Sequence, residues 1–296
     1  MIKKLSIALV AALYIFSCFC LSHAAEVQDE IGRKLIIKNT PQRIVSLAPG
    51  ITEILYALNL EERIAGVTTF CNWPIAARQK PKIGGFINPS IEKIVALHPD
   101  LIIATADGNR KETVQQLERI GLTVYVTNPA DTKGILKSIM RIGEITATEE
   151  NARELAGGLQ KRLDAVTAQV RGKRKPRIFF QIGLDPVITA GKDTLINEII
   201  DLAGGMNIAG SATARYPRYS AEGITAGNPD IILFAPMAND KEFAAVKNFW
   251  YKFREIPAVK TNNIYPIDTD LISRASPRII EAVEKMSLLF HPELKL

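Results

Sequence analysis

Two stretches of the chain, residues 90–105 (SIEKIVALHPDLIIAT) and residues 220–235 (SAEGITAGNPDIILFA), follow the same pattern. Aligned without gaps, they are identical at seven of 16 positions, which include the serine, the glutamate and the Pro-Asp pair. Repetition over such a long period indicates two structural units that are built alike. The repeat therefore predicts a molecule with two similar halves.

Each copy predicts a helix, a turn and a strand. Ser90 and Ser220 suit the start of a helix, because a serine hydroxyl accepts from an unpaired backbone N–H of the first turn. Glu92 and Glu222 fall in that turn, where the helix dipole favours a negative charge by a few tenths to about 1 kcal/mol. A proline ends each helix, and the apolar run after it predicts a buried strand. The glutamates have two interpretations: they only stabilise their helices, or they present two matching acidic points.

The rest of the chain fits a two-lobed α/β protein. Its 296 residues are 47% hydrophobic and 23% charged, as in ordinary globular proteins. Strand patterns alternate with helical patterns in both halves, which predicts mostly parallel sheets. Residues 132–170 are helical in pattern, with a fresh helix start at residues 148–150. The helix that follows would be roughly 33 Å long at 1.5 Å per residue, so it either bridges two lobes or packs on one sheet.

These patterns divide the chain into an N-terminal lobe (41–130), a linking helical segment (131–172) and a C-terminal lobe (173–296). Residues 26–40 predict a leading hairpin. Near the end of the chain, residues 268–274 predict a loop. Ser276 and Pro277 predict the start of the last helix, because proline is favoured at the first helical position.

Residues 1–24 differ from everything that follows. Two lysines precede a nearly continuous apolar run, and Ser22 and Ala24 stand at the −3 and −1 positions of a cleavage site after Ala24. This pattern is typical of a secretory signal peptide and predicts export; the apolar run is too short for a membrane anchor. Lipid attachment at Cys18 is the less favoured alternative, because Phe16 replaces the usual small residue of a lipoprotein cleavage site.

Charge and cysteine content exclude two other classes. The net charge of +6 includes two lysines of the leading segment, and the one basic cluster, residues 171–175, lies where a helix should end. A solvated helix end explains that cluster better than a nucleic-acid site does, so we expect no nucleic-acid partner. After cleavage only Cys71 remains, which predicts no internal disulfide.

The sequence lacks the short motifs of phosphate-binding loops, dinucleotide-binding turns, zinc proteases and serine hydrolases. The two histidines beyond residue 24, His98 and His291, both precede prolines at expected helix ends, where structural roles are commoner than metal ligation. Cys71 has no base nearby in sequence that would activate it. We therefore expect no enzyme activity, no catalytic residues and no resident metal or cofactor.

Aromatic side chains gather in loops instead. Phe70, Trp73 and Phe86 come from the first half, and Tyr216 and Tyr219 from the second. Ligands of parallel-sheet lobes bind in crevices beyond the carboxyl ends of the strands. Flat apolar groups on two facing lobes would suit a large, flat, partly apolar ligand. For any one of these aromatics alone, packing within its loop is the commoner role.

The chain resembles the cobalamin-binding proteins of ATP-binding-cassette (ABC) importers, in a helical-backbone class that also carries ferric siderophores and haem. The similarity runs from about residue 43 to residue 289. The stretches that carry it are RIVSLAP at 43–49 with Thr52-Glu53, IEKIVALHPD at 91–100, the phrase from Phe180 through Gly191-Lys192 to GGMN at 204–207, and RASPR at 274–278. The last two resemble the cobalamin branch more closely than the siderophore branch.

The resemblance implies two lobes joined by a single long backbone helix, with the ligand in the cleft between them. It implies that Glu92 and Glu222 dock on arginines of two permease subunits, one lobe to each, in an importer that also has ATPase subunits. It places the protein in the periplasm. We expect a monomer that binds a corrinoid and delivers it to this permease.

The resemblance also assigns five positions to the cleft: Phe70, Phe86, Tyr216, Asp270 and Arg274. Phe70 stands where a tyrosine is familiar in this family, Phe86 and Tyr216 where tryptophans are, and Thr105 replaces another tryptophan. These departures leave open whether the ligand is cobalamin, cobinamide or a relative. A siderophore or haem remains the alternative ligand, and Arg215 and Arg218 favour it. An exported hydrolase would need a nucleophile with a base or a metal cluster, which the sequence lacks.

Overall fold

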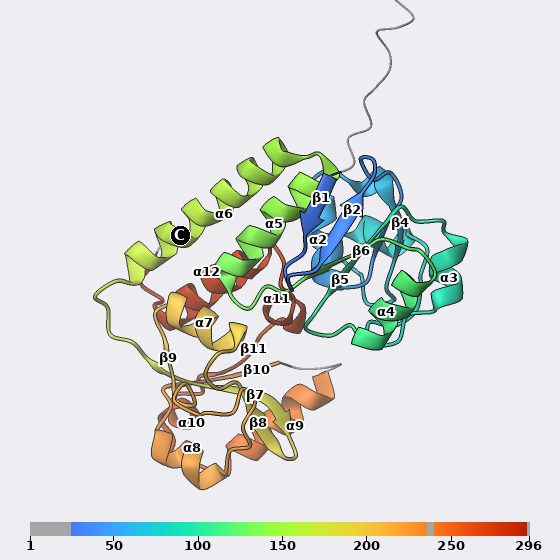
Figure 1. Cartoon of the computed structure of the whole chain (residues 1–296). Helices are drawn as coiled ribbons and strands as arrows, with labels where there is room; N and C mark the ends of the chain where they lie inside the picture. The colour runs from blue at the N-terminus through green and yellow to red at the C-terminus, as the bar shows by residue number, and fades with distance from the viewer. Residues whose placement is uncertain (1–24, 236–239, 295–296) are drawn as a thin grey trace, which may run out of the picture.

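The structure, a computed structural model, describes residues 25–235 and 240–294. The predicted signal peptide at residues 1–24, with Cys18, lies outside these ranges. Within them, no helix is both long enough and apolar enough to cross a membrane. Figure 1 shows two lobes, with helices α5 (Thr132–Thr146) and α6 (Glu149–Val170) running between them.

The N-terminal lobe is built on a four-stranded parallel sheet in the order β4–β3–β5–β6. The leading segment forms the predicted hairpin. The elements of this lobe are β1 (Ala25–Gln28), β2 (Lys34–Ile37), β3 (Ile44–Ser46), α2 (Pro49–Ala57), a 3-10 turn (Glu61–Arg63), β4 (Ile64–Val67), a second 3-10 turn (Ile75–Gln79), α3 (Ile91–Ala96), β5 (Leu101–Thr105), α4 (Lys111–Arg119) and β6 (Val124–Thr127).

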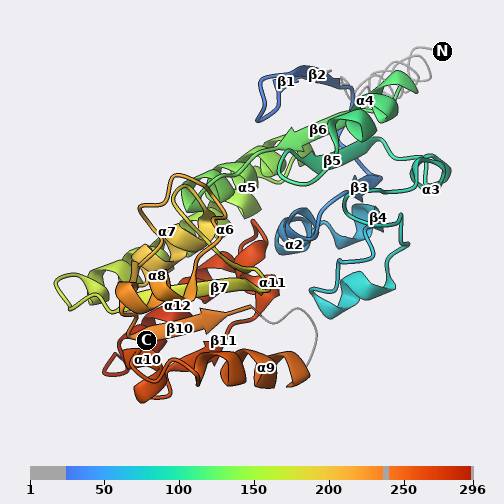
Figure 2. The ribbon, with the colours of Figure 1, turned by 90° about the horizontal axis from the view of Figure 1, so that it is seen from below.

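The C-terminal lobe has a five-stranded sheet in which β11, β10, β7 and β8 follow one another and β9 also pairs with β7. All pairs are parallel except β7 with β8. Figure 2 shows β7, β10 and β11 side by side. The elements are β7 (Arg177–Leu184), β8 (Val187–Thr189), α7 (Leu195–Leu202), β9 (Met206–Asn207), α8 (Ala221–Gly227), β10 (Ile231–Phe234), α9 (Asp240–Trp250), α10 (Pro257–Lys260), β11 (Ile264–Pro266), α11 (Thr269–Ser273) and α12 (Ile279–Phe290).

The repeat forms the same structure in both lobes, as predicted. Ser90 accepts from the backbone N–H of Lys93 at the start of α3, and Ser220 accepts from that of Gly223 at the start of α8. Each helix leads through a Pro-Asp turn into the central strand β5 or β10. The two units therefore share a fold as well as a sequence pattern.

The aspartates of the two repeats explain why the Pro-Asp pair occurs twice. The carboxylate of Asp100 accepts from the backbone N–H of Arg43 at 2.9 Å, just before β3. The carboxylate of Asp230 accepts from the N–H of Arg177 at 2.8 Å, at the start of β7. Each of these arginines in turn donates from its side chain to a carbonyl at the end of the repeat's helix. The same contact thus fixes one strand start in each lobe.

The two lobes share one apolar core. Side chains alternate between the faces of a strand, and Leu101 and Ile103 of β5 belong to the same buried cluster as Ile231 and Leu233 of β10. Residues of α2, α5, α6, α7 and α12 also belong to that cluster. Helix α6 packs along α5 and α12 as it passes between the lobes. Because this shared core is apolar, we expect the lobes to keep nearly one arrangement.

These observations confirm the predicted fold class: two α/β lobes on mostly parallel sheets, joined through a long helix. The boundaries assigned to the lobes stay a prediction. The basic cluster at 171–175 lies at the end of α6, as expected for a helix terminus. Three of its residues form ion pairs at 2.6 to 3.0 Å: Lys173 with Glu293, Arg174 with Asp230 and Lys175 with Asp201.

Two local predictions near the end of the chain are wrong. Residues 268–274 contain helix α11, because Asp268 caps its first turn and the apolar side chains of Leu271 and Ile272 are buried by it. The last helix begins at Ile279, with Arg278 at its cap position. Ser276 accepts from the backbone N–H of Arg278 at 3.2 Å, so it orders the turn before the helix.

Candidate functional site

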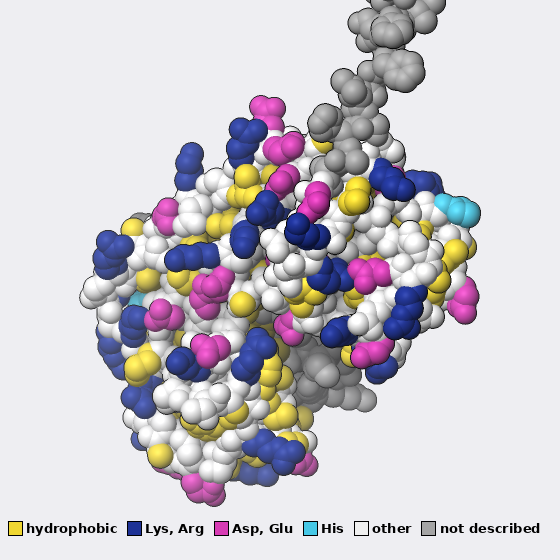
Figure 3. All heavy atoms as spheres, viewed as in Figure 1, with side chains coloured by type: hydrophobic (Ala, Val, Ile, Leu, Met, Phe, Trp, Pro, Cys, Tyr) yellow, Lys and Arg dark blue, Asp and Glu magenta, His cyan; other side chains and the backbone are white. Residues whose placement is uncertain are grey.

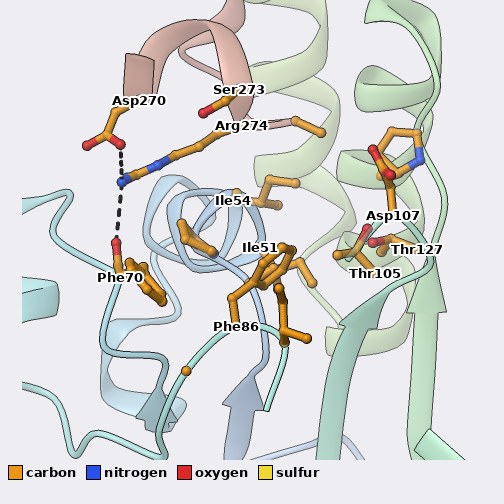
Figure 4. A pocket seen from close by; sticks show the side chains of 18 of the residues that line it. Ile51, Ile54, Phe70, Phe86, Thr105, Asp107, Thr127, Asp270, Ser273 and Arg274 are labelled. Carbon is orange, nitrogen blue, oxygen red and sulfur yellow. Dashed lines mark hydrogen bonds and ion pairs between the residues drawn. The ribbon is translucent and has the colours of Figure 1, made fainter. Parts of the chain in front are cut away.

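A cavity of about 630 Å³ lies between the two lobes (Figure 4). Its N-terminal wall follows the carboxyl ends of β3, β5 and β6, where ligands of parallel sheets bind. The segment from Asp270 to Ala275 closes the opposite side. The residues that line it include Ile51 and Ile54 of α2, Phe70, Phe86, Thr105, Asp107, Thr127, Asp270 and Arg274.

A second cavity of about 390 Å³ adjoins the first on the side of the C-terminal lobe. The two share Asp107, Pro129, Ser273 and Ala275 in their walls. The second chamber is otherwise mostly apolar, with Tyr216 and Arg215 at its C-terminal side. We refer to the two chambers together as the cleft.

The structure brings all five predicted cleft residues to this place. Phe70, Phe86, Asp270 and Arg274 line the first chamber, and Tyr216 lines the second. Phe70 and Tyr216 are 59% and 52% exposed, so much of each ring is open to the cleft and to solvent. All five residues thus line one cleft between the lobes, as a shared ligand site would need. Their contact with a ligand stays a prediction.

The position of Phe86 depends on two residues of the turn that follows β5. Asn109 donates from its side-chain amide to the carbonyls of Phe86 (2.8 Å) and Leu47 (3.0 Å). Gly108 has φ +139°, and a Cβ there would overlap the Phe86 ring. A side chain at residue 108 would therefore displace Phe86. Pattern reasoning misses the role of Asn109, because Phe86 and Leu47 lie 23 and 62 positions away from it.

Arg274 joins the two lobes through a network that we call the inter-lobe clasp, made of Glu53, Asn72, Asp270 and Arg274. Its Nη1 donates to Glu53 Oε1 of α2 and to Asn72 Oδ1, both at 2.8 Å. Its Nη2 pairs with Asp270 Oδ1 at 2.6 Å and donates to the carbonyl of Phe70 at 3.3 Å. Asn72 also donates to Asp270 Oδ2 at 2.8 Å. Figure 4 shows the bonds to Asp270 and Phe70.

The clasp is buried at its centre. Arg274 is 8% exposed and Glu53 is 3% exposed. Burial raises the pKa of Glu53 above its ordinary value of 4.5, and the hydrogen bond from Arg274 offsets part of that rise. Within the described residues, Glu53 Oε2 has no hydrogen-bond partner. Backbones of the two lobes also meet nearby, since a Cβ at Gly50 would lie 2.6 Å from the carbonyl oxygen of Ala275.

Two aromatics of the predicted pattern lie outside the walls of the cleft. The guanidinium of Arg278 stacks over the ring of Trp73 at 4.2 Å, so this tryptophan has a partner in the protein. Tyr219 packs against Phe179 in the core of the C-terminal lobe, with ring centroids 6.1 Å apart. For these two residues, packing explains the position better than ligand binding does.

Glu92 and Glu222 are both exposed, at matching places on α3 and α8. Figures 1 and 2 show these helices at opposite ends of the molecule, one on each lobe. The pKa of Glu222 is lowered by its own backbone N–H and by the Ser220 hydroxyl. Figure 3 shows lysine, arginine, aspartate and glutamate side chains intermixed over the visible face of the molecule. Two carboxylates at equivalent exposed sites fit a partner with two equivalent binding sites.

Two similar lobes, a helical connection and an aromatic cleft at their junction define a two-lobed substrate-binding protein. The chain belongs to the periplasmic binding protein family, whose sequence profile matches residues 44–271. Members of this family bind substrates and are not enzymes.

Individual relatives agree with this class. An uncharacterized ABC transporter substrate-binding lipoprotein of Bacillus subtilis, YvrC, is 32% identical over 90% of this chain and 85% of its own length. The vitamin B12-binding protein BtuF of Vibrio cholerae superposes with a TM-score of 0.76 at 28% identity, covering 87% of this chain and 99% of its own. The haem-binding protein HutB of the same species gives a TM-score of 0.78 at 26% identity, covering 85% and 99%. The chain is therefore an ABC-importer substrate-binding protein of the vitamin B12, haem and siderophore class.

Proposed function

We propose that the protein captures cobalamin or a related corrinoid in the cleft and delivers it, chemically unchanged, to an ABC importer. The observation that carries this proposal is the composition of the cleft walls. Apolar and aromatic side chains come from both lobes, while the guanidinium of Arg274 is already bound to protein groups. A corrinoid matches such walls, because its ring is large and flat and its rim carries neutral amides rather than acids.

The cleft residues divide into two roles in this proposal. Phe86 and Tyr216 pack against the ligand's flat or apolar edges, one from each lobe. Asp270 and the remaining N–H group of Arg274, that of Nε, reach its amide rim. The similarity to the vitamin B12-binding protein of V. cholerae supports a corrinoid as the ligand.

Haem or a ferric siderophore is the second candidate. Two observations favour it: the similarity to the haem-binding protein HutB, and the half-exposed phenol of Tyr216, an oxygen donor that could reach iron. Arg215 could pair with an acidic ligand, although its Nε already donates to the Asp193 carbonyl at 3.1 Å. Arg218, the second arginine that the sequence analysis named for an acidic ligand, lines neither chamber.

Calorimetry separates the candidates. We expect cobalamin, and cobinamide as its base-free relative, to titrate with one ligand per protein and to be recovered unchanged. Heat from haem or from a ferric siderophore, with none from either corrinoid, would overturn the corrinoid assignment. It would leave the class of protein intact.

We further propose that the protein works in the periplasm after removal of residues 1–24, and that Glu92 and Glu222 dock on the two permease subunits. Lipid anchoring at Cys18 is the alternative, which the lipoprotein relative supports. Charge pairs at a docking rim set encounter rate and register. Glu92→Arg with Glu222→Arg should keep ligand affinity but abolish transport and transporter-stimulated ATP hydrolysis.

The matched control reverses Glu62 and Glu255, which are also exposed and lie one on each lobe. That control should transport normally. Normal transport by the Glu92 and Glu222 double variant would return both residues to a role in helix stability alone.

A further inference from the structure

Asp107 occupies an unusual place in the cleft. It lies after β5 and belongs to the walls of both chambers, so it stands where the two chambers meet. Figure 4 shows it on the side of Thr105 and Thr127, across the cavity from Asp270 and Arg274. Its side chain is exposed. A ligand that spans both chambers would pass directly by this carboxylate.

The other charged side chains of the cleft walls have partners in the protein. Both oxygens of Asp270 are bound, by Arg274 and by Asn72. Arg274 is held by the inter-lobe clasp, and Arg215 donates to a backbone carbonyl and lies over the Tyr216 ring. Asp107 makes no hydrogen bond or ion pair with any residue in the described ranges. Of the carboxylates in those walls, Asp107 is therefore the one without a protein partner in the described ranges.

A ligand that covers Asp107 removes water from a carboxylate, which is costly unless the ligand supplies hydrogen bonds in return. A primary amide supplies an N–H donor, and a hydrogen bond to an ionised acceptor is stronger than a neutral one. A carboxylate at the same place supplies no donor and adds a second negative charge. The site therefore favours an amide and disfavours an acid of nearly the same shape.

We propose that Asp107 is a specificity-determining residue that accepts from an amide N–H of the ligand's rim and rejects ligands with a carboxylate there. This inference rests on the proposed corrinoid function. It adds that the protein distinguishes complete, fully amidated corrinoids from derivatives in which one amide is hydrolysed to an acid. An amide and a carboxylate have almost the same size, so charge and donor pattern make the distinction.

The test measures the affinities of cobalamin and of each of its single-acid derivatives, in which one propionamide is hydrolysed, by calorimetry at pH 7. The wild-type protein should bind at least one derivative about 10-fold or more weakly than cobalamin. Asp107→Asn should shrink that ratio by about 10-fold, chiefly by tighter binding of the acid. Glu112→Gln is the matched control: it removes one exposed negative charge from the same lobe, outside both chambers, and should leave the ratio unchanged.

Each outcome has a separate meaning. Ratios in Asp107→Asn that stay within twofold of wild type for every derivative would overturn the role of Asp107 while the corrinoid function stands. An equal shift in Glu112→Gln would also overturn it, because the effect would then be a general one of net charge. Failure of the wild-type protein to bind cobalamin would refute the proposed function, and the inference would fall with it.

Discussion

Removal of the buried Glu53 carboxylate should cost the protein far more stability than removal of one partner of an exposed ion pair. In Glu53→Ala the guanidinium of Arg274 stays almost fully buried but loses its 2.8 Å acceptor in α2. Breaking one side of a buried pair typically costs about 3–5 kcal/mol, because a charge is left without compensation. Arg274 keeps Asp270, Asn72 and the Phe70 carbonyl, so we expect the lower end, about 3 kcal/mol.

The assay is urea unfolding at pH 7, followed by circular dichroism, with the free energy of unfolding taken from midpoint and slope. Glu144→Ala is the matched control, because Glu144 pairs with Arg141 at 2.6 Å while both side chains are about half exposed. Exposed pairs contribute roughly 0–1 kcal/mol. We therefore expect the two glutamate-to-alanine changes to differ by about 2 kcal/mol or more.

The double variant Glu53→Ala with Arg274→Met tests the mechanism. It removes the uncompensated charge, so its loss of stability should be smaller than the sum of the two single losses by about 1–3 kcal/mol. Additive losses, or a cost below about 1 kcal/mol for Glu53→Ala alone, would show that the clasp does not hold the lobes as described.

Two further predictions concern protonation and the aromatic walls. Because burial raises the pKa of Glu53, the folded state holds that proton more tightly than the unfolded state. Wild type should therefore lose stability relative to Glu53→Gln as the pH rises from 4.5 through the raised pKa. The free energies of unfolding of the two proteins are measured at several pH values, and a difference between them that does not change with pH would contradict this prediction. Truncating a buried aromatic anchor costs about 2 kcal/mol or more, so Phe86→Ala and Tyr216→Ala should each weaken corrinoid binding about 30-fold. Tyr251→Ala, an exposed tyrosine outside the cleft, is the control, and wild-type affinity in both cleft variants would place the ligand elsewhere.

The sequence predicted the fold well because the fold is repeated within it. Two copies of one pattern predicted two lobes, and the caps by Ser90 and Ser220 are where the pattern placed them. A strand such as β5, which is buried on both faces, is a continuous apolar run in the sequence, and such a run predicts a buried strand. The start of α12 was predicted wrongly. Ser276 and Pro277 are residue types that favour a helix start, but the turn before the helix continues through Arg278 and the helix begins at Ile279.

The site was predicted less completely, for a physical reason. Phe70, Phe86, Tyr216, Asp270 and Arg274 reach the cleft as the family resemblance implied. Their mutual contacts could not be predicted, because the clasp joins residues about 200 positions apart in the chain. Two partners of Asn109 could not be predicted either, because Phe86 and Leu47 lie 23 and 62 positions away.

Asp107 gave no signal in the sequence for a different reason. Next to Gly108 it has the composition of a turn. Its proposed role follows only from the two chambers that meet beside it. A turn residue of this kind becomes a candidate once the cavity walls are known.

An absorption spectrum of the protein purified from its native host tests the central claim most directly, because the three ligand classes absorb at different wavelengths. The account predicts corrinoid bands that co-purify with the protein at no more than one ligand per chain and are lost when Phe86 and Tyr216 are both changed to alanine. A Soret band of haem or the charge-transfer band of a ferric siderophore in place of the corrinoid bands would contradict it.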